Sequence, residues 1–206
     1  RRGGQETVDA ALALSLFAGM LLHGLVGECL SRAPAAVLAQ PSYVKKVVFP
    51  IELLPLAVVG TAMVQFLIGS AVLLLALLFT QGLPATAWLW PLAWLPLLAL
   101  AAGISFMLAA LTVYLRDLAQ LTGFVATLLL FLSPVFYSLD SAPPGWQQWL
   151  LLNPLTVPIE VTRSLLIKGT GIPLALWGWH AAGCAAALWA GWWIFQRTRK
   201  GFADVI

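Results

Sequence analysis

Charged residues are scarce in this chain. Only 9% of its 206 residues are Asp, Glu, Lys or Arg, whereas 61% are hydrophobic. A soluble domain of this size needs far more charge on its surface, so the composition excludes an ordinary soluble fold. No Asp, Glu, Lys, Arg or His occurs between Glu52 and Arg116, a stretch long enough for two membrane crossings of about 20 residues each. The composition therefore predicts an integral membrane protein with several spans.

The motifs of soluble enzymes are also missing. The sequence has no glycine-rich phosphate loop ending in Lys and Ser or Thr, no His and Cys at metal-ligand spacing, and no pair of nucleophile and base. We therefore expect no enzyme activity, no ATP hydrolysis by this chain itself, no metal and no nucleic-acid partner. Cys29 and Cys184 lie at different depths of two predicted spans, which favours packing residues over a disulfide.

Five apolar stretches are predicted to cross the membrane as α-helices, because they lack the alternation of barrel strands. They cover residues 10–30, 51–80, 89–115, 119–139 and 174–196. Around the start of the third, Trp88, Trp90 and Trp94 form a cluster typical of a membrane interface. The predicted fold class is all-α, a polytopic membrane protein with a single transmembrane domain over residues 1–206.

Basic residues indicate the orientation of these spans. Most of the eleven Lys and Arg residues would lie on one side of the membrane. They are Arg32, Lys45, Lys46, Arg116, Arg197, Arg199 and Lys200. The positive-inside rule makes that side cytoplasmic. The N-terminus would then lie outside, so we expect one more span before residue 1.

Residues 133–173 cannot form one continuous helix, because prolines interrupt them at Ser133-Pro134, Pro143-Pro144, Asn153-Pro154 and Pro158. A helix over residues 155–167 would be only about 20 Å long. If that helix crossed the membrane, the basic C-terminus would be exported. A re-entrant hairpin over about residues 140–170, entering from the outer side, satisfies both constraints. Irregular backbone at this depth must be covered by protein or line a water-filled cavity, so we predict a pore-lining or gate element.

Two acidic residues at the predicted inner boundary each allow two interpretations. Glu28 ends the first span and Glu52 begins the second. Either they pair structurally with Arg32, Lys45 or Lys46, or they have a role within the membrane. Both lie close to the boundary, where the cost of a charge is lower.

Two further ionisable sites fall in apolar surroundings. Glu160 and Arg163 are three residues apart and can meet on one side of a helix, either as a structural pair or as part of the gate. His23 lies on an apolar helix and is expected to be a hydrogen-bonded packing residue rather than a proton relay.

Lys45 and Lys46 stand between two prolines at the cytoplasmic edge. A lysine pair can hold the phosphate of a lipid-linked substrate as a point charge. Attraction to anionic headgroups, worth about 1 kcal/mol per lysine, explains the same position.

Several short motifs, kept in order along the chain, resemble the membrane subunit of polysaccharide-exporting ABC transporters, the type-2 permeases for O-antigen, some capsules and teichoic acids. They are residues 28–34 (ECLSRAP), 40–55 (QPSYVKKVVFPIELLP), 114–118 (YLRDL), 132–138 (LSPVFYS), 152–155 (LNPL) and 199–206 (RKGFADVI). The resemblance covers nearly the whole chain. That family begins with an interfacial helix and one more span, neither of which matches a part of this sequence.

The resemblance implies a homodimer of six-helix subunits with two ATPase subunits on the cytoplasmic face. ATP and Mg²⁺ would bind to those partners, and no cofactor to this chain. By position, the contacts to the ATPase subunit would be Arg32, Ala33, Pro34, Gln40, Tyr114, Arg116 and Asp117. The periplasmic gate would contain Pro134, Tyr137, Asn153, Pro154, Glu160 and Arg163.

The resemblance also implies a substrate and a location. The expected substrate is an O-antigen-like polysaccharide on undecaprenyl diphosphate, moved across the bacterial inner membrane. Aromatic rings would line its path, since sugar C–H faces slide along rings, and the alternative is that these rings face lipid. They are Phe124, Phe131, Phe136 and Tyr137. A capsule or teichoic-acid exporter and an ion-coupled flippase of lipid-linked glycans remain alternatives.

Overall fold

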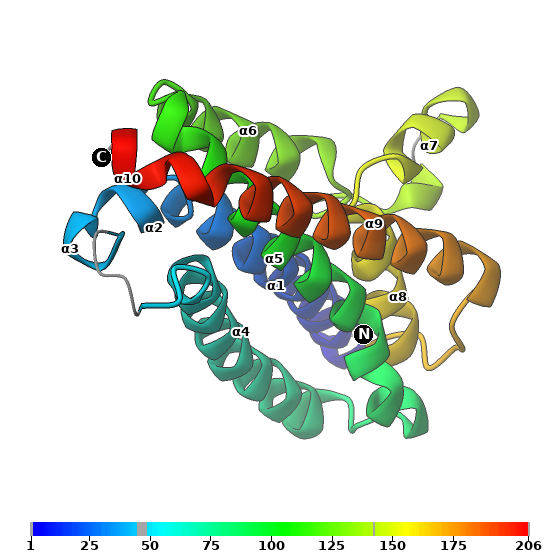
Figure 1. Ribbon diagram of the computed structural model, residues 1–206. Helices are drawn as coiled ribbons and strands as arrows, with labels where there is room; N and C mark the ends of the chain where they lie inside the picture. Colours follow the sequence, from blue (N-terminus) through cyan, green and yellow to red (C-terminus); the bar gives the residue numbers. More distant parts are fainter. Residues whose placement is uncertain (1, 45–48, 142, 206) are drawn as a thin grey trace.

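The secondary structure of the described residues is entirely helical. The computed structural model describes residues 2–44, 49–141 and 143–205, and every regular element in these residues is helical (Figure 1). The five longest elements run back and forth between the same two ends of the molecule. They are α1 (Arg2–Arg32), α4 (Leu53–Thr80), α5 (Trp90–Tyr114), α6 (Leu118–Leu132) and α9 (Leu174–Thr198). This arrangement confirms the predicted all-α class.

Short elements gather at the two ends of the long helices (Figure 1). One end, which we call the basic end, carries α2 (Ala35–Leu38), α3 (Pro41–Val44), the 3-10 turn η3 (Arg199–Gly201) and α10 (Phe202–Val205). The opposite end, which we call the hairpin end, carries η1 (Ala85–Leu89), η2 (Leu139–Ser141), α7 (Pro144–Leu151) and α8 (Thr156–Leu166). The basic residues Arg197, Arg199 and Lys200 and the prolines within residues 134–158 therefore lie at opposite ends of the fold.

Among the described residues, three helical segments are long and apolar enough to cross a membrane, judged by length and composition. They are Ala10–Arg32, Leu53–Thr80 and Ala85–Tyr114, close to the first three predicted spans. The 25-residue α9 is long enough but less apolar, because it contains several tryptophans and His180. The two remaining spans stay predictions.

The fourth predicted span differs from the observed helix. Residues 119–139 were expected to be helical, but α6 ends at Leu132. Ser133 is extended, with φ −89° and ψ 149°, as the residue before a proline prefers. At 15 residues α6 is about 22 Å long, shorter than the roughly 30 Å hydrocarbon core. Residues 133–138 therefore belong to the hairpin end instead of completing a span.

Helix α5 is the centre of the fold and packs against α1, α4, α8 and α9. Its contact with α9 is closest where Gly103 faces Gly191. A Cβ atom on Gly103 would lie 2.5 Å from the carbonyl oxygen of Ala187, and one on Gly191 would collide with the backbone of Gly103. Both positions need glycine because backbone meets backbone there.

Candidate functional site

The segment that follows the end of α6 is tied to the start of α8 by side-chain hydrogen bonds. Asn153 Nδ2 donates to Ser133 Oγ over 3.0 Å, and Asn153 Oδ1 accepts from the Leu155 N–H over 2.9 Å. The second bond is the local turn that Asn favours ahead of a helix. Pro134 is buried and Pro154 half-buried beside this connection. Three residues predicted for the gate, Pro134, Asn153 and Pro154, are thus brought together.

Arg163 on α8 binds the backbone of the segment that follows α6. Its Nη2 donates to the Val135 carbonyl over 2.9 Å and its Nη1 to the Tyr137 carbonyl over 3.0 Å. The same Nη1 meets Glu160 Oε1 at 2.9 Å, and that carboxylate also accepts from the Leu139 N–H over 3.4 Å. Arg163 and Glu160 together hold residues 135–139 on α8, so both have structural contacts, and their predicted part in a gate stays a prediction. We call this arrangement the Arg163 clamp.

The clamp reaches α1 through Val135, which is fully buried. A Cβ on Gly19 of α1 would lie 3.2 Å from Val135 Cα, so backbone and helix touch directly. A second contact joins α1 to α6 itself: the His23 ring of α1 donates from Nε2 to the Ala126 carbonyl of α6 over 2.9 Å. The prediction that His23 is a hydrogen-bonded packing residue is confirmed.

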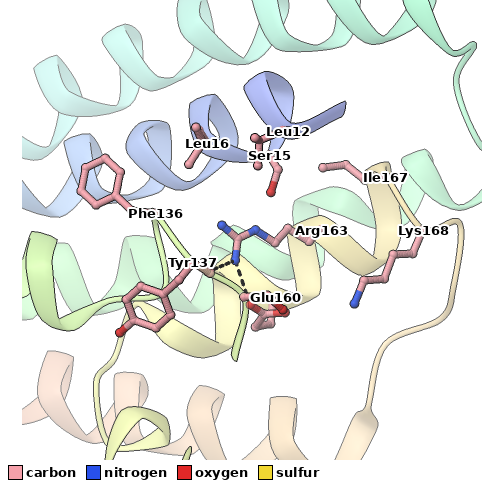
Figure 2. Close-up of a pocket in the computed structure, with 10 residues that line it drawn as sticks. Leu12, Ser15, Leu16, Phe136, Tyr137, Glu160, Arg163, Ile167 and Lys168 are labelled. Atoms are coloured by element: carbon pink, nitrogen blue, oxygen red, sulfur yellow. Dashed lines mark hydrogen bonds and ion pairs between the residues drawn. The ribbon is translucent and has the colours of Figure 1, made fainter. Parts of the chain in front are cut away.

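A cavity of about 170 Å³ lies beside the clamp, between α1, α8 and the segment after α6 (Figure 2). We call it the gate pocket. Its lining combines apolar, aromatic, hydroxyl and charged side chains. They are Leu12, Ser15, Leu16, Phe136, Tyr137, Ser138, Glu160, Arg163, Ile167 and Lys168. Ser15 and Lys168 were not singled out from the sequence, because nothing in their local pattern relates α1 to α8.

The predicted path aromatics project away from the packed core. Phe124 is 63% exposed, Phe131 66% and Phe136 49%. Phe124 and Phe131 are seven residues apart and share one face of α6. The rings of Phe131 and Phe136 have centroids 6.3 Å apart, and Phe136 also lines the gate pocket. The exposed face of α6 therefore leads along aromatic rings to the gate pocket.

At the basic end, the most deeply buried side chain of α2 is Val37, and Ala36 and Leu38 pack beside it. Val37 is fully buried, as are Ala33 and Pro34 just before α2, whereas Arg32 and Gln40 are exposed. Val37 joins an apolar cluster made by α5, α9 and α10. Its other buried members are Phe106, Ala109, Ala110, Val113, Phe195 and Phe202. The predicted ATPase contacts in residues 32–40 are thus divided into buried and exposed positions. Sequence reasoning missed Val37 and Phe202, which belong to the same buried cluster.

The turn between α5 and α6 lies at the same end. Tyr114 donates from its hydroxyl to the Thr198 carbonyl at the end of α9 over 2.9 Å, while Arg116 and Asp117 are exposed. Figure 1 places this turn, α2 and the C-terminus together. The exposed members of the predicted ATPase contacts therefore lie at one end of the fold, on a surface that we call the basic face, whereas Ala33 and Pro34 are buried beneath it.

The two boundary glutamates have different partners. Glu28 pairs with Arg32 across 2.8 Å, as one prediction had it. Glu52 was expected to pair with Arg32, Lys45 or Lys46, but it forms an ion pair with Arg199 and accepts from Gln196 Nε2 over 3.2 Å. That correction arises because α9 ends beside the start of α4. Lys45 and Lys46 lie outside the described residues.

These features define a polytopic α-helical membrane protein with a broken hairpin at one end and a basic face at the other. The chain matches the ABC-2 type transporter family over residues 2–167 and belongs to that family. The resemblance found in the sequence motifs is thereby confirmed.

The relatives found by comparison are export permeases. The chain is similar to the O-antigen export system permease protein RfbA of Klebsiella pneumoniae, with 30% identity over 138 residues that cover 64% of this chain and 52% of that protein. It is also similar to the O-antigen export system permease protein RfbA of Myxococcus xanthus, with 28% identity over 204 residues, 93% of this chain and 75% of that protein. The chain spans about half the length of the Klebsiella relatives that it matches.

Proposed function

We propose that this chain is the transmembrane subunit of an ATP-driven exporter that moves an undecaprenyl-diphosphate-linked, O-antigen-like polysaccharide out of the cytoplasm. The observation that carries the proposal is the family membership together with relatives named as O-antigen export permeases. The separation of the basic face from the hairpin end is what a machine driven from one side of the membrane needs. A bacterial inner membrane is the location this function requires.

The proposal assigns ATP hydrolysis to a separate partner. Two ATPase subunits would bind ATP and Mg²⁺ and sit on the basic face of a homodimer of this permease, which itself binds no cofactor. Exposed Arg32, Gln40, Arg116 and Asp117 would contact them. Because Val37 anchors α2 in the cluster of α5, α9 and α10, a push on α2 would move those helices together.

The glycan would follow the exposed aromatic face of α6 toward the hairpin end. Phe124, Phe131 and Phe136 offer apolar surface without a fixed hydrogen-bond register, which suits a repeating sugar chain. The Arg163 clamp would hold the outer gate together. Lys45 and Lys46 would attract either the lipid diphosphate or anionic headgroups at the cytoplasmic surface.

Capsule and teichoic-acid export are the alternatives closest to this proposal, because both use the same kind of path. An ion-coupled flippase is less favoured, since such a carrier needs ionisable groups in the middle of its spans. Here Glu28, Glu52 and Arg116 lie toward the basic end, and Glu160 with Arg163 toward the other. The histidines within helices, His23 and His180, contact the Ala126 carbonyl and Cys184 as packing residues.

The test is deletion of the gene for this chain, followed by purification of the tagged protein from complemented cells. We expect loss of surface polysaccharide, its accumulation inside the cell, and copurification of an ATPase subunit whose activity depends on this chain. Two copies with different tags should copurify. Normal surface polysaccharide after deletion, or export that persists when the copurified ATPase is inactivated, would contradict the proposal.

A further inference from the structure

The gate pocket has the size of a small polar ligand. Its volume is about 170 Å³, well above the roughly 10–15 Å³ that a cavity needs to hold one water and below the roughly 300 Å³ at which drug-sized sites begin. A single sugar ring falls in this range. A polysaccharide could therefore place one residue in the pocket while the rest of the chain stays outside.

A buried polar atom beside the pocket lacks a partner. Arg163 is 7% exposed, and its Nε has no hydrogen-bond acceptor in the part of the chain that the structure describes. Buried N–H groups in proteins are nearly always paired. In Figure 2 the Ser15 hydroxyl points from α1 toward the Arg163 guanidinium. That Nε is inaccessible to solvent, so a ligand hydroxyl would instead accept from the second N–H of Nη2, whose first N–H goes to the Val135 carbonyl, and would bond to the serine, because a hydroxyl both donates and accepts.

Aromatic rings flank the same opening. Figure 2 shows Phe136 and Tyr137 on one side of the Arg163 guanidinium, with Ile167 and Lys168 on the other. The pocket thus combines an apolar ring surface with hydroxyl and carboxylate groups. A sugar ring has apolar C–H faces that can pack on the aromatic rings and hydroxyl groups that can bond to the polar side chains. A phosphate fits less well, because both terminal nitrogens of Arg163 are already bonded and Glu160 is on the same wall.

The pocket also continues the aromatic face of α6. The centroids of Phe131 and Phe136 are 6.3 Å apart, and Phe136 forms part of the pocket wall. A glycan that moves along α6 would reach the gate pocket where the aromatic face ends.

We propose that the gate pocket binds one hexopyranose residue of the outgoing glycan, through Ser15, Glu160, Arg163 and the rings of Phe136 and Tyr137. This inference rests on the proposed function. Its role would be to hold the emerging chain at the outer end between power strokes, so that export proceeds in one direction.

Photo-crosslinking tests the proposal directly. The photoreactive amino acid p-benzoylphenylalanine is introduced at Ser138, which lines the pocket, and as a control at Ala13, which is exposed on α1 outside the lining. Both proteins are irradiated with their ATPase partner in cells that make sugar-radiolabelled, lipid-linked polysaccharide. We expect labelled glycan on the Ser138 protein and several-fold less on the Ala13 protein. Equal labelling of the two proteins, or none at Ser138 while the wild-type complex exports glycan, would overturn the pocket proposal.

Substitution at Ser15 gives a second measurement. Ser15→Ala removes one hydroxyl and should reduce crosslinking from Ser138 roughly fivefold, the effect of about one neutral hydrogen bond. Ser15→Phe should fill the pocket and abolish crosslinking, whereas Ala13→Phe should leave it unchanged. Membrane levels and ATPase copurification check folding of each variant. If the wild-type complex exports no glycan at all, the proposed function itself fails; if export is normal and Ser15→Phe crosslinks like wild type, only the pocket proposal fails.

Discussion

The Arg163 guanidinium donates from Nη2 to the carbonyl of Val135 over 2.9 Å, joining two segments that are 28 residues apart in sequence. Val135 in turn packs on Gly19 of α1. The Arg163 side chain of α8 therefore holds the segment that follows α6 against α1. The segment after α6, α8 and α1 therefore form one connected unit.

Replacing Arg163 by Leu should destabilise this unit, because Glu160 would lose its cation in a largely buried site and two carbonyls would lose their donor. Breaking a buried pair from one side costs about 3 kcal/mol or more. Denaturant unfolding in micelles and proteolysis within residues 133–141 measure the loss. The matched control is Arg197→Leu, since Arg197 is exposed and lies over the Trp193 ring. Equal stability of the two variants would contradict a clamp.

A methyl group at Gly191 should disrupt the contact between α5 and α9. Gly191→Ala would push against the Gly103 backbone and should cost about 1–3 kcal/mol, as overpacking does. Gly178→Ala on the same helix meets nothing within 4 Å and should stabilise by roughly 0.5–1 kcal/mol through helix propensity. Thermal unfolding in detergent distinguishes them, and a stabilising Gly191→Ala would refute the close approach.

Truncation of Val37 should loosen the packing of α2 on the core, although Ala36 and Leu38 still contact it. Val37→Ala removes two methyl groups from a fully buried site and should cost about 1–2 kcal/mol. We expect the ATPase partner to copurify still, but with weaker stimulation of its activity by the permease. Ala39→Ser, on the exposed side of the same turn, serves as the control. Unchanged stimulation in the Val37 variant would remove α2 from the transmission path.

Charge reversal at Arg116 should weaken the partner contact without affecting the fold. Arg116 is exposed on the basic face, so Arg116→Glu is expected to change stability by no more than about 0.5 kcal/mol. Copurification of the ATPase subunit should fall, and more steeply at low salt than at high salt. Lys168→Glu, at the hairpin end, tests whether any charge reversal has this effect. A normal yield of the partner with Arg116→Glu would contradict the proposed contact.

The ion pair between Glu52 and Arg199 should show coupling in a double-mutant cycle. Because Arg199 is 42% exposed, we expect a coupling energy of only about 0.5–1 kcal/mol. Glu52→Arg and Arg199→Glu should each lower stability, and the double exchange should recover part of the loss. Absence of any recovery would show that α4 and α9 are held together by packing alone.

Much of the architecture was predictable from residue order. The apolar runs predicted α1, α4 and α5 closely, and the prolines predicted that residues 133–173 cannot form one helix, as the separate helices α7 and α8 show. The re-entrant course of this hairpin stays a prediction. The end of α6 was missed because apolar residues continue through 135–137, although Pro134 already prevents a helix there. Pairs within one helix, such as Glu28 with Arg32 or Glu160 with Arg163, followed from helical spacing.

The sequence by itself determined that this protein belongs in a membrane, which end is basic, and where helices must break, since these depend on composition and on local backbone chemistry. Only the tertiary structure decided that Arg163 holds the Val135 and Tyr137 carbonyls, that Glu52 meets Arg199, and that Ser15 faces the gate pocket. Those relationships join residues far apart in sequence. Their partners depend on how the helices pack, which no local pattern encodes.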